Sequence, residues 1–316
     1  MGRCGRPLRL SHNLSHNLPF RVARSDTTDD GKDDGKDHGP AQIGRRGRSG
    51  DTATSRHTAI MLASIMYHHA GSGPFSNSPE LLERQFAGIA RRGIRTVHPC
   101  DELADGPNLC LVFDDAYYDF YHHVYPRLKA HGVKAVLAVP TAFIVEKTDL
   151  SPESRLSFPH DQAMEDPDAA RRRAPFCTWE EIRQMLREGQ GAIAVAAHGH
   201  AHELFAGDEP IAEDALRSQS IIERETGAAC RSFVPAFGKL PDRRDRLIPS
   251  FDHLFTIGGE KYEEWPDPPD EISRYPGDNQ ADPQSMIESL FPRRSLRYRL
   301  GAVRRRVESF LNPNEE

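Results

Sequence analysis

Three histidines stand within five residues, at His198, His200 and His202, directly after the apolar run 193–197. Packing alone does not explain them, because each buried imidazole needs hydrogen-bond partners. Neutral imidazole is the commonest metal ligand in proteins. If a helical turn follows the run, His198 and His202 converge on one ion, whereas His200 points elsewhere. A plain polar loop is the alternative interpretation.

Two adjacent carboxylates, Asp114 and Asp115, follow a second apolar run, LCLVF. Because consecutive residues of a strand point to opposite sides, one carboxylate can bind a metal while the other faces a bound water. A helix cap beside a solvated charge is the alternative. A further polar pair, His68 and His69, follows the run 59–67. Two histidines and one carboxylate leave a coordination position open for water, which is typical of a catalytic metal site.

The elements that would position these side chains alternate between strands and helices. Strands are predicted at 59–67, 109–113, 135–139, 193–197, 232–235 and 254–257. Helix signals lie between them, namely Ser78 with Pro79, Gly93, Gly132, the capping box Thr178 to Glu181, and Gly227 after the amphipathic stretch 211–226. Such an order predicts a parallel sheet covered by helices, either a barrel or a doubly wound sheet. In a barrel the chemistry lies at the C-terminal ends of the strands, where these polar groups stand.

Composition excludes several other classes of protein. The 316 residues are 37% hydrophobic, and no run approaches the roughly 18 apolar residues of a membrane-spanning helix. Five scattered cysteines without C-x-x-C spacing argue against a disulfide framework and a cysteine zinc site. No G-x-G-x-x-G or G-K-[ST] motif supports nucleotide binding. The N-terminal stretch SHNLSHNL is too polar for a signal peptide, so we expect a cytoplasmic protein.

Three parts are predicted along the chain. Residues 1–58, with the tandem DDGKDDGKD, lack the apolar side chains for a core and are predicted to form a disordered tail. Residues 59–291 form the folded body, whose acidic excess makes it a poor nucleic-acid binder. Residues 292–316 carry seven arginines in a loosely amphipathic helical pattern. We expect this segment to pack on the acidic body, and peripheral contact with an anionic membrane face is the alternative.

The motifs, taken together, resemble one family. They are MYHH at Met66, FDDAYYDFY at Phe113, YPRLKAHGVKA at Tyr125, VPTAFI at Val139, TWEEI at Thr178, the His198-x-x-x-His202 element and VPAFGK at Val234. Over about residues 60–278 they look like the polysaccharide deacetylases, carbohydrate esterase family four. A Tyr-His before the Asp-Asp is similar to the permuted branch that includes the poly-N-acetylglucosamine de-N-acetylases.

The resemblance implies a distorted (β/α) barrel of about seven parallel strands. It also implies a metal-dependent hydrolase that removes N-acetyl groups from an N-acetylated carbohydrate. A non-catalytic sugar-binding or scaffold descendant of the same barrel is one alternative. A related amidohydrolase that acts on a non-sugar amide is the other.

The resemblance also implies a role for particular residues. Asp114 is the general base and His68 the general acid. The implied metal ligands are Asp115, His198 and His202, around one divalent ion for which zinc suits the imidazoles. The motif in which a backbone N–H holds the oxyanion falls on Pro235, Ala236, Phe237 and Gly238.

Two positions depart from the family pattern. Ala116 stands where glycine usually follows the aspartate pair, and a positive φ there would cost alanine on the order of 1 kcal/mol. Val234 stands where much of the family has an arginine oriented on the catalytic aspartate. Arg274 is the nearest later residue that could supply the missing charge, although we expect it to be an exposed loop arginine.

Overall fold

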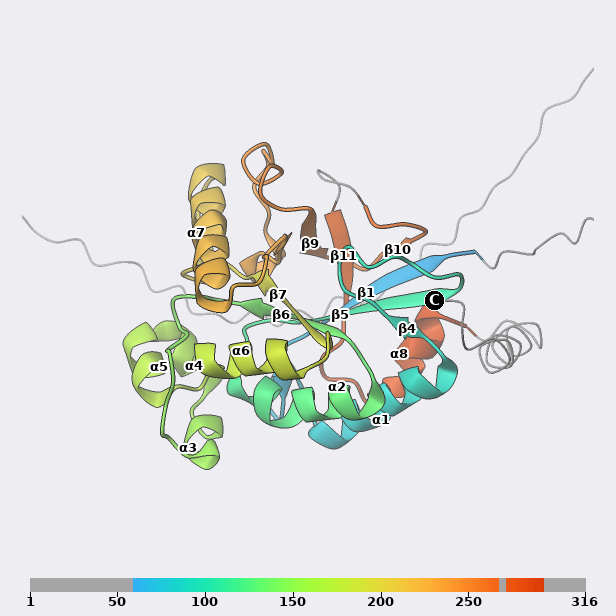
Figure 1. Cartoon of the computed structure of the whole chain (residues 1–316), viewed down its shortest axis with the longest axis horizontal. Helices are drawn as coiled ribbons and strands as arrows, with labels where there is room; N and C mark the ends of the chain where they lie inside the picture. Colours follow the sequence, from blue (N-terminus) through green and yellow to red (C-terminus); the bar gives the residue numbers. More distant parts are fainter. Residues whose placement is uncertain (1–58, 267–270, 293–316) are drawn as a thin grey trace, which may run out of the picture. The chain divides into compact units, whose positions relative to one another are not determined.

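The computed structural model describes residues 59–266 and 271–292 (Figure 1). The predicted disordered tail, 1–58, and nearly all of the predicted basic segment, 292–316, lie outside the described residues. In the part that is described, no helix has both the length and the apolar character needed to cross a membrane.

Seven parallel strands close into a barrel in the described part of the chain. Around the ring they are β1 (Met61–Tyr67), β11 (Glu271–Pro276), β9 (His253–Ile257), β8 (Ser232–Phe233), β7 (Ile193–Ala197), β6 (Ala135–Val139) and β5 (Pro107–Phe113). The ring closes because β1 pairs with both β11 and β5. The predicted barrel is therefore confirmed, and β11 is the seventh strand, which the apolar pattern did not locate.

Shorter strands extend this ring. Beside the N-terminal halves of the strands, β10 (Lys261–Tyr262) pairs antiparallel with β1, and β4 (Arg95–Thr96) pairs parallel with β5. Directly after β1, β2 (His69–Ala70) pairs with β3 (Ser76–Asn77). This small ladder fixes the backbone of His69 at the C-terminal end of β1.

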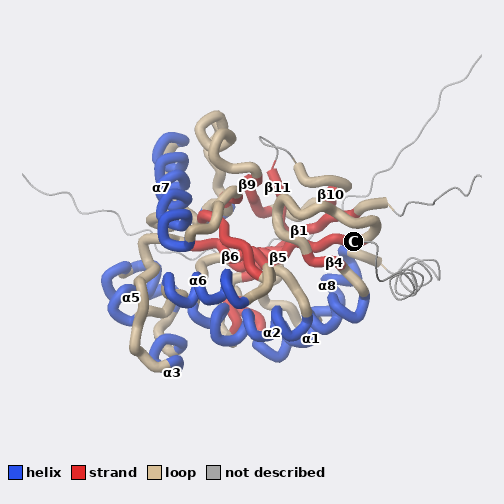
Figure 2. Tube along the Cα trace, viewed as in Figure 1, coloured by secondary structure: helices blue, strands red, loops and turns tan. Residues whose placement is uncertain are grey.

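In the view of Figure 2, helices lie below and to the left of the strands, and loops lie above them. They are α1 (Pro79–Arg92), α2 (Tyr125–His131), α3 (Pro152–Leu156), α4 (His160–Glu165), α5 (Pro167–Arg173), α6 (Trp179–Glu188), α7 (Asp208–Thr226) and α8 (Pro283–Leu290). A π-helix, η1 (Phe120–Val124), runs into α2, and a 3-10 turn, η2 (Ala236–Gly238), follows β8. Helix α1 packs against both α2 and α8, and α6 packs against α7.

The predicted helix ends are confirmed where capping chemistry defines them. The Ser78 hydroxyl accepts a hydrogen bond from the Leu81 amide, and α1 ends at Gly93 in the left-handed conformation. At the start of α6, Thr178 and Glu181 form the predicted reciprocal capping box. These contacts satisfy backbone groups that the first and last helical turns leave without partners.

The strands are buried on both faces, which explains their continuous apolar runs. One buried cluster includes Leu62, Cys110, Val112, Val136, Ala138, Ala196, Phe255 and Ile272. Their strand neighbours belong to the larger cluster shared with the helices. Side chains alternate along a strand, so the first cluster fills the barrel interior. The same alternation places residues 114, 198 and 274 on the interior side.

The segment 146–175, expected only as a polar insertion, contains the short helices α3, α4 and α5. Arg155, 3% exposed, ties this segment to the barrel. Its guanidinium donates to the carbonyls of Ala174 and Phe176 and to both oxygens of Glu181. It also lies 3.4 Å from the ring centre of Tyr118. This anchoring fixes the position of His160, the first residue of α4.

Candidate active site

Asp115, His198 and His202 lie together at the C-terminal ends of β5 and β7. The Nε2 atoms of His198 and His202 are 3.2 Å and 3.1 Å from the same oxygen, Asp115 Oδ1. The chain after β7 bends through Gly199 and His202, both at positive φ, which brings the two rings to 5.0 Å. One ligand atom from each of the three residues lies within 4.8 Å of the others, close enough for one metal ion.

The hydrogen bonds around His198 favour a cation at this position. The Nδ1 of His198 lies 2.7 Å from the Val234 carbonyl oxygen, which can only accept, so Nδ1 donates. In neutral His198, Nε2 therefore presents a lone pair toward the Asp115 carboxylate. Two acceptors at 3.2 Å require either a proton on Nε2 or a metal cation between them. Carboxylate and imidazole donors with a fixed tautomer fit a divalent transition-metal ion.

Electrostatics keeps Asp115 ionised. Burial raises the pKa of its carboxyl, but hydrogen bonds from three imidazoles outweigh burial and hold the pKa well below its usual range. Burial lowers the pKa of the His198 imidazole, but the contact with the Asp115 carboxylate outweighs burial. The pKa of His198 is therefore raised. The Asp115 carboxylate therefore carries a negative charge that attracts either protons or a metal ion.

Asp114 points to the barrel interior and pairs with Arg274. The guanidinium Nη1 donates to Asp114 Oδ1 at 2.7 Å, and Nε donates to the Thr256 carbonyl at 3.2 Å. The expectation that Arg274 is an exposed loop arginine is therefore wrong, because it lies in β11 with 0% exposure. It supplies the charge that Val234, a buried apolar residue, does not. The two neighbouring aspartates thus have different partners.

Replacing Arg274 by methionine is expected to destabilise the protein by about 3 to 5 kcal/mol, because a buried Asp114 charge loses its partner. Denaturant unfolding followed by circular dichroism measures the change. The matched control is Arg231→Met, which removes the exposed pair with Asp252 and should cost less than about 1 kcal/mol. Equal losses in the two variants would contradict the assignment of Arg274.

His68, at the end of β1, is held by Asp278. Its Nδ1 lies 2.6 Å from Asp278 Oδ2, and its backbone amide donates to Asp278 Oδ1 at 3.1 Å. Burial lowers the pKa of His68, but Asp278 and the other nearby carboxylates outweigh burial and raise the pKa to about 9. The sequence reasoning did not select Asp278. Its place directly after the seventh strand is the signal that could have found it.

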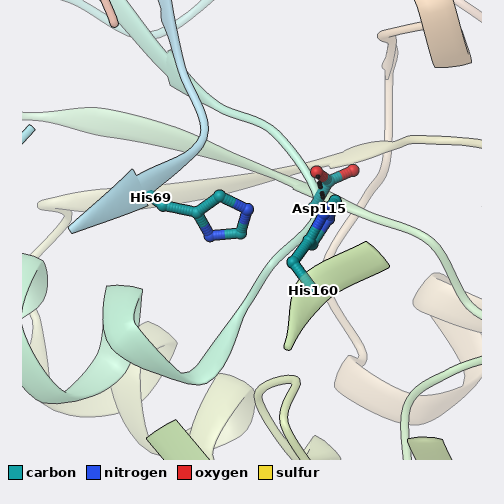
Figure 3. A group of neighbouring side chains, drawn as sticks. All are labelled: His69, Asp115 and His160. Atoms are coloured by element: carbon teal, nitrogen blue, oxygen red, sulfur yellow. Dashed lines mark hydrogen bonds and ion pairs between the residues drawn. The ribbon is translucent and has the colours of Figure 1, made fainter. Parts of the chain in front are cut away.

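Two further histidines lie beside Asp115 (Figure 3). His160 Nε2 is 3.0 Å from Asp115 Oδ2, and the ring of His69 stands 4.4 Å from the ring of His160. His160 was missed because it lies in the segment expected to be a polar insertion. By contrast, His200 turns away as expected, with Nδ1 2.9 Å from the Thr141 hydroxyl.

The turn after β8 contains Pro235, Phe237 and Gly238. Phe237 has φ 58° and is 55% exposed, and its ring lies 5.2 Å from that of His202. The Gly238 amide donates to the Pro235 carbonyl at 3.1 Å. That amide is therefore already engaged, which makes Gly238 an unsuitable oxyanion donor.

Ala116 adopts the left-handed conformation that glycine would favour, with φ 49°. Ala116→Gly is expected to change the free energy of unfolding by less than about 1 kcal/mol, because relief of strain is offset by the lost buried methyl group. Ala116→Val should destabilise by about 2 to 3 kcal/mol, since a β-branched residue resists positive φ in a packed site. Urea unfolding of both variants measures this, and a neutral valine variant would show that the backbone there is unstrained.

Comparisons with known proteins relate the sequence and the fold to a known family. Residues 103–252 match the family described as Polysaccharide deacetylase. This match to a polysaccharide deacetylase domain covers just under half of the chain. A search of curated proteins finds no match.

Several solved structures share the fold. IcaB from Ammonifex degensii is 19% identical with a TM-score of 0.56, covering 74% of this chain and 97% of its own. The deacetylase PplD from Streptococcus pyogenes is 16% identical with a TM-score of 0.56, covering 74% and 100%. A de-N-acetylase from Aggregatibacter actinomycetemcomitans is 20% identical with a TM-score of 0.53, covering 73% and 99%.

Proposed function

We propose that this protein is a metal-dependent hydrolase that removes N-acetyl groups from an N-acetylated oligo- or polysaccharide. One observation carries the proposal: Asp114 and Asp115 are neighbours in the chain but have separate partners. Asp114 is paired with a buried guanidinium, whereas Asp115 is surrounded by imidazoles. Two carboxylates with different environments can take two different roles in one reaction.

Asp115, His198 and His202 are the proposed ligands of a divalent ion, with zinc as the best match to two imidazoles and a carboxylate. When bound, such an ion lowers the pKa of a water molecule and polarises the acetyl oxygen. The ligand side chains follow β5 and β7, which β6 separates in the sheet.

Asp114 is the proposed general base, which takes the proton from the attacking water. Arg274 holds its carboxylate in place. His68 is the proposed general acid, which gives a proton to the departing amine, and Asp278 is its positioning residue. Because the Gly238 amide is engaged, we place the oxyanion donor at the amide of Phe237, with Pro235 and Gly238 shaping the turn.

The departure at Ala116 does not favour a non-catalytic descendant. Its backbone already has the positive φ that the site requires, and its side chain is fully buried. The fold therefore accommodates alanine at position 116 in the left-handed backbone conformation. We retain hydrolysis as the function, and the binding module becomes an outcome of the test.

The test is an assay of free-amine release from N-acetylglucosamine oligomers. The full chain should release amine, lose this activity after treatment with a chelator, and regain it when Zn²⁺ is added back. Oligomer binding without amine release, after zinc restoration, would show a binding module instead. Release from simple N-acetyl amides but not from the oligomers would favour the non-sugar amidohydrolase.

A further inference from the structure

His69 is not one of the three proposed ligands, but its side chain is oriented like that of a metal-ligating histidine. Its Nδ1 lies 3.3 Å from Asp119 Oδ2, and the same oxygen accepts the Ala70 amide at 2.9 Å. The side chain is 9% exposed, and its Nε2 is buried without a hydrogen-bond partner in the described part of the chain. A carboxylate on one ring nitrogen orients the ring and leaves the other nitrogen free to bind a metal.

His160 brings a second imidazole to the same place. Its Nε2 contacts Asp115 Oδ2 at 3.0 Å, and its ring meets the His69 ring edge-on, as Figure 3 shows. One ligand atom from each of His69, His160 and Asp115 lies within 4.8 Å of the others. Tyr117 covers the two imidazoles, with ring distances of 4.9 Å and 5.6 Å. Its hydroxyl donates to the Phe158 carbonyl, two residues before His160.

His160 and the pair His198 and His202 contact different oxygens of one carboxylate. His198 and His202 contact Asp115 Oδ1, whereas His160 contacts Oδ2. Among the described residues, the two groups able to hold an ion share only Asp115. One ion therefore does not reach all four imidazoles, but a carboxylate can bridge two ions through its two oxygens.

We propose a second divalent-cation site formed by His69, His160 and Asp115 Oδ2, beside the first and bridged to it by Asp115. Two imidazoles and one carboxylate oxygen suit a zinc-type ion and leave a position for water. The Nε2 atom of His69, which has no hydrogen-bond partner among the described residues, would bind the ion at this site. The proposal concerns metal content, so it is tested without turnover and stands apart from the proposed hydrolysis.

The experiment measures zinc stoichiometry. The full chain, stripped with a chelator, is dialysed against excess Zn²⁺ and then desalted and analysed for metal. Wild type should hold two ions per chain, and His69→Ala and His160→Ala should each hold one. His198→Ala should also hold one, because it leaves the second group intact. His200→Ala is the matched control and should hold two.

Folding is checked by circular dichroism, and His160→Gln provides a milder variant because the His160 side chain is 32% exposed. Anomalous diffraction at the zinc edge from wild-type crystals should show two peaks, one on each side of the Asp115 carboxylate. A single ion that is lost in His198→Ala and kept in His160→Ala would overturn the second site while leaving the first. Two ions retained in both His69→Ala and His160→Ala would also overturn it.

Discussion

Asp114→Asn is expected to lower the turnover number for deacetylation by roughly 10²- to 10⁴-fold, because asparagine cannot take a proton from the attacking water. Metal content should stay at the wild-type level, since Asp114 is not a proposed ligand. His68→Ala should cause a loss of similar size by removing the proton donor for the amine. Amine-release kinetics and metal analysis of the same preparations measure both quantities.

The double variant tests whether these two residues work on one proton path. Its loss should be smaller than the product of the single losses, because residues that act as a unit are not additive. Asp252→Asn is the matched control, since Asp252 is also paired with an arginine but is exposed. It should retain wild-type turnover. A rate for Asp114→Asn above a tenth of wild type would remove Asp114 from the role of base.

Loss of either proposed ligand histidine is expected to abolish measurable turnover. His198→Ala and His202→Ala each remove an imidazole from Asp115 Oδ1, so the ion at that position loses a ligand from a set of three. Metal content should fall by one ion per chain relative to wild type. Elemental analysis and amine release after dialysis against Zn²⁺ measure these losses.

His200→Ala is the matched control for this experiment. It removes a histidine from the same short segment, but one whose ring contacts Thr141. Its metal content and turnover should equal those of wild type. Full metal retention in both ligand variants would show that His198 and His202 are not ligands.

Much of the fold could be predicted because local chemistry defines it. The strands at 135–139 and 193–197 and the capped ends of α1 and α6 were found from apolar runs and capping residues. The seventh strand, β11, was not found because its sequence, EISRYP, lacks a continuous apolar run. Its inward-facing residue is Arg274, where other strands have apolar residues, and Arg274 pairs with Asp114.

Parts of the candidate site could not be predicted for a related reason. The pairing of Arg274 with Asp114 depends on the register of β11 beside β1, which no local pattern sets. His160 lies at the start of a six-residue helix, too short to give a periodic signal. The polar groups directly after the predicted strands, by contrast, were found by position alone. The cytoplasmic location and the chain divisions at 58 and 292 stay predictions of the sequence.

The closure of the barrel by β11 has a consequence for how the protein matures. Asp114 is separated from Arg274 by 160 residues, and His68 from Asp278 by 210 residues. A growing chain that has not yet reached β11 already contains the proposed metal ligands, but it lacks both Arg274 and Asp278. Contacts so distant in sequence form late, because loop closure must precede them. Metal uptake can therefore come before catalytic competence, and partially folded chains would hold an ion without an oriented acid or base.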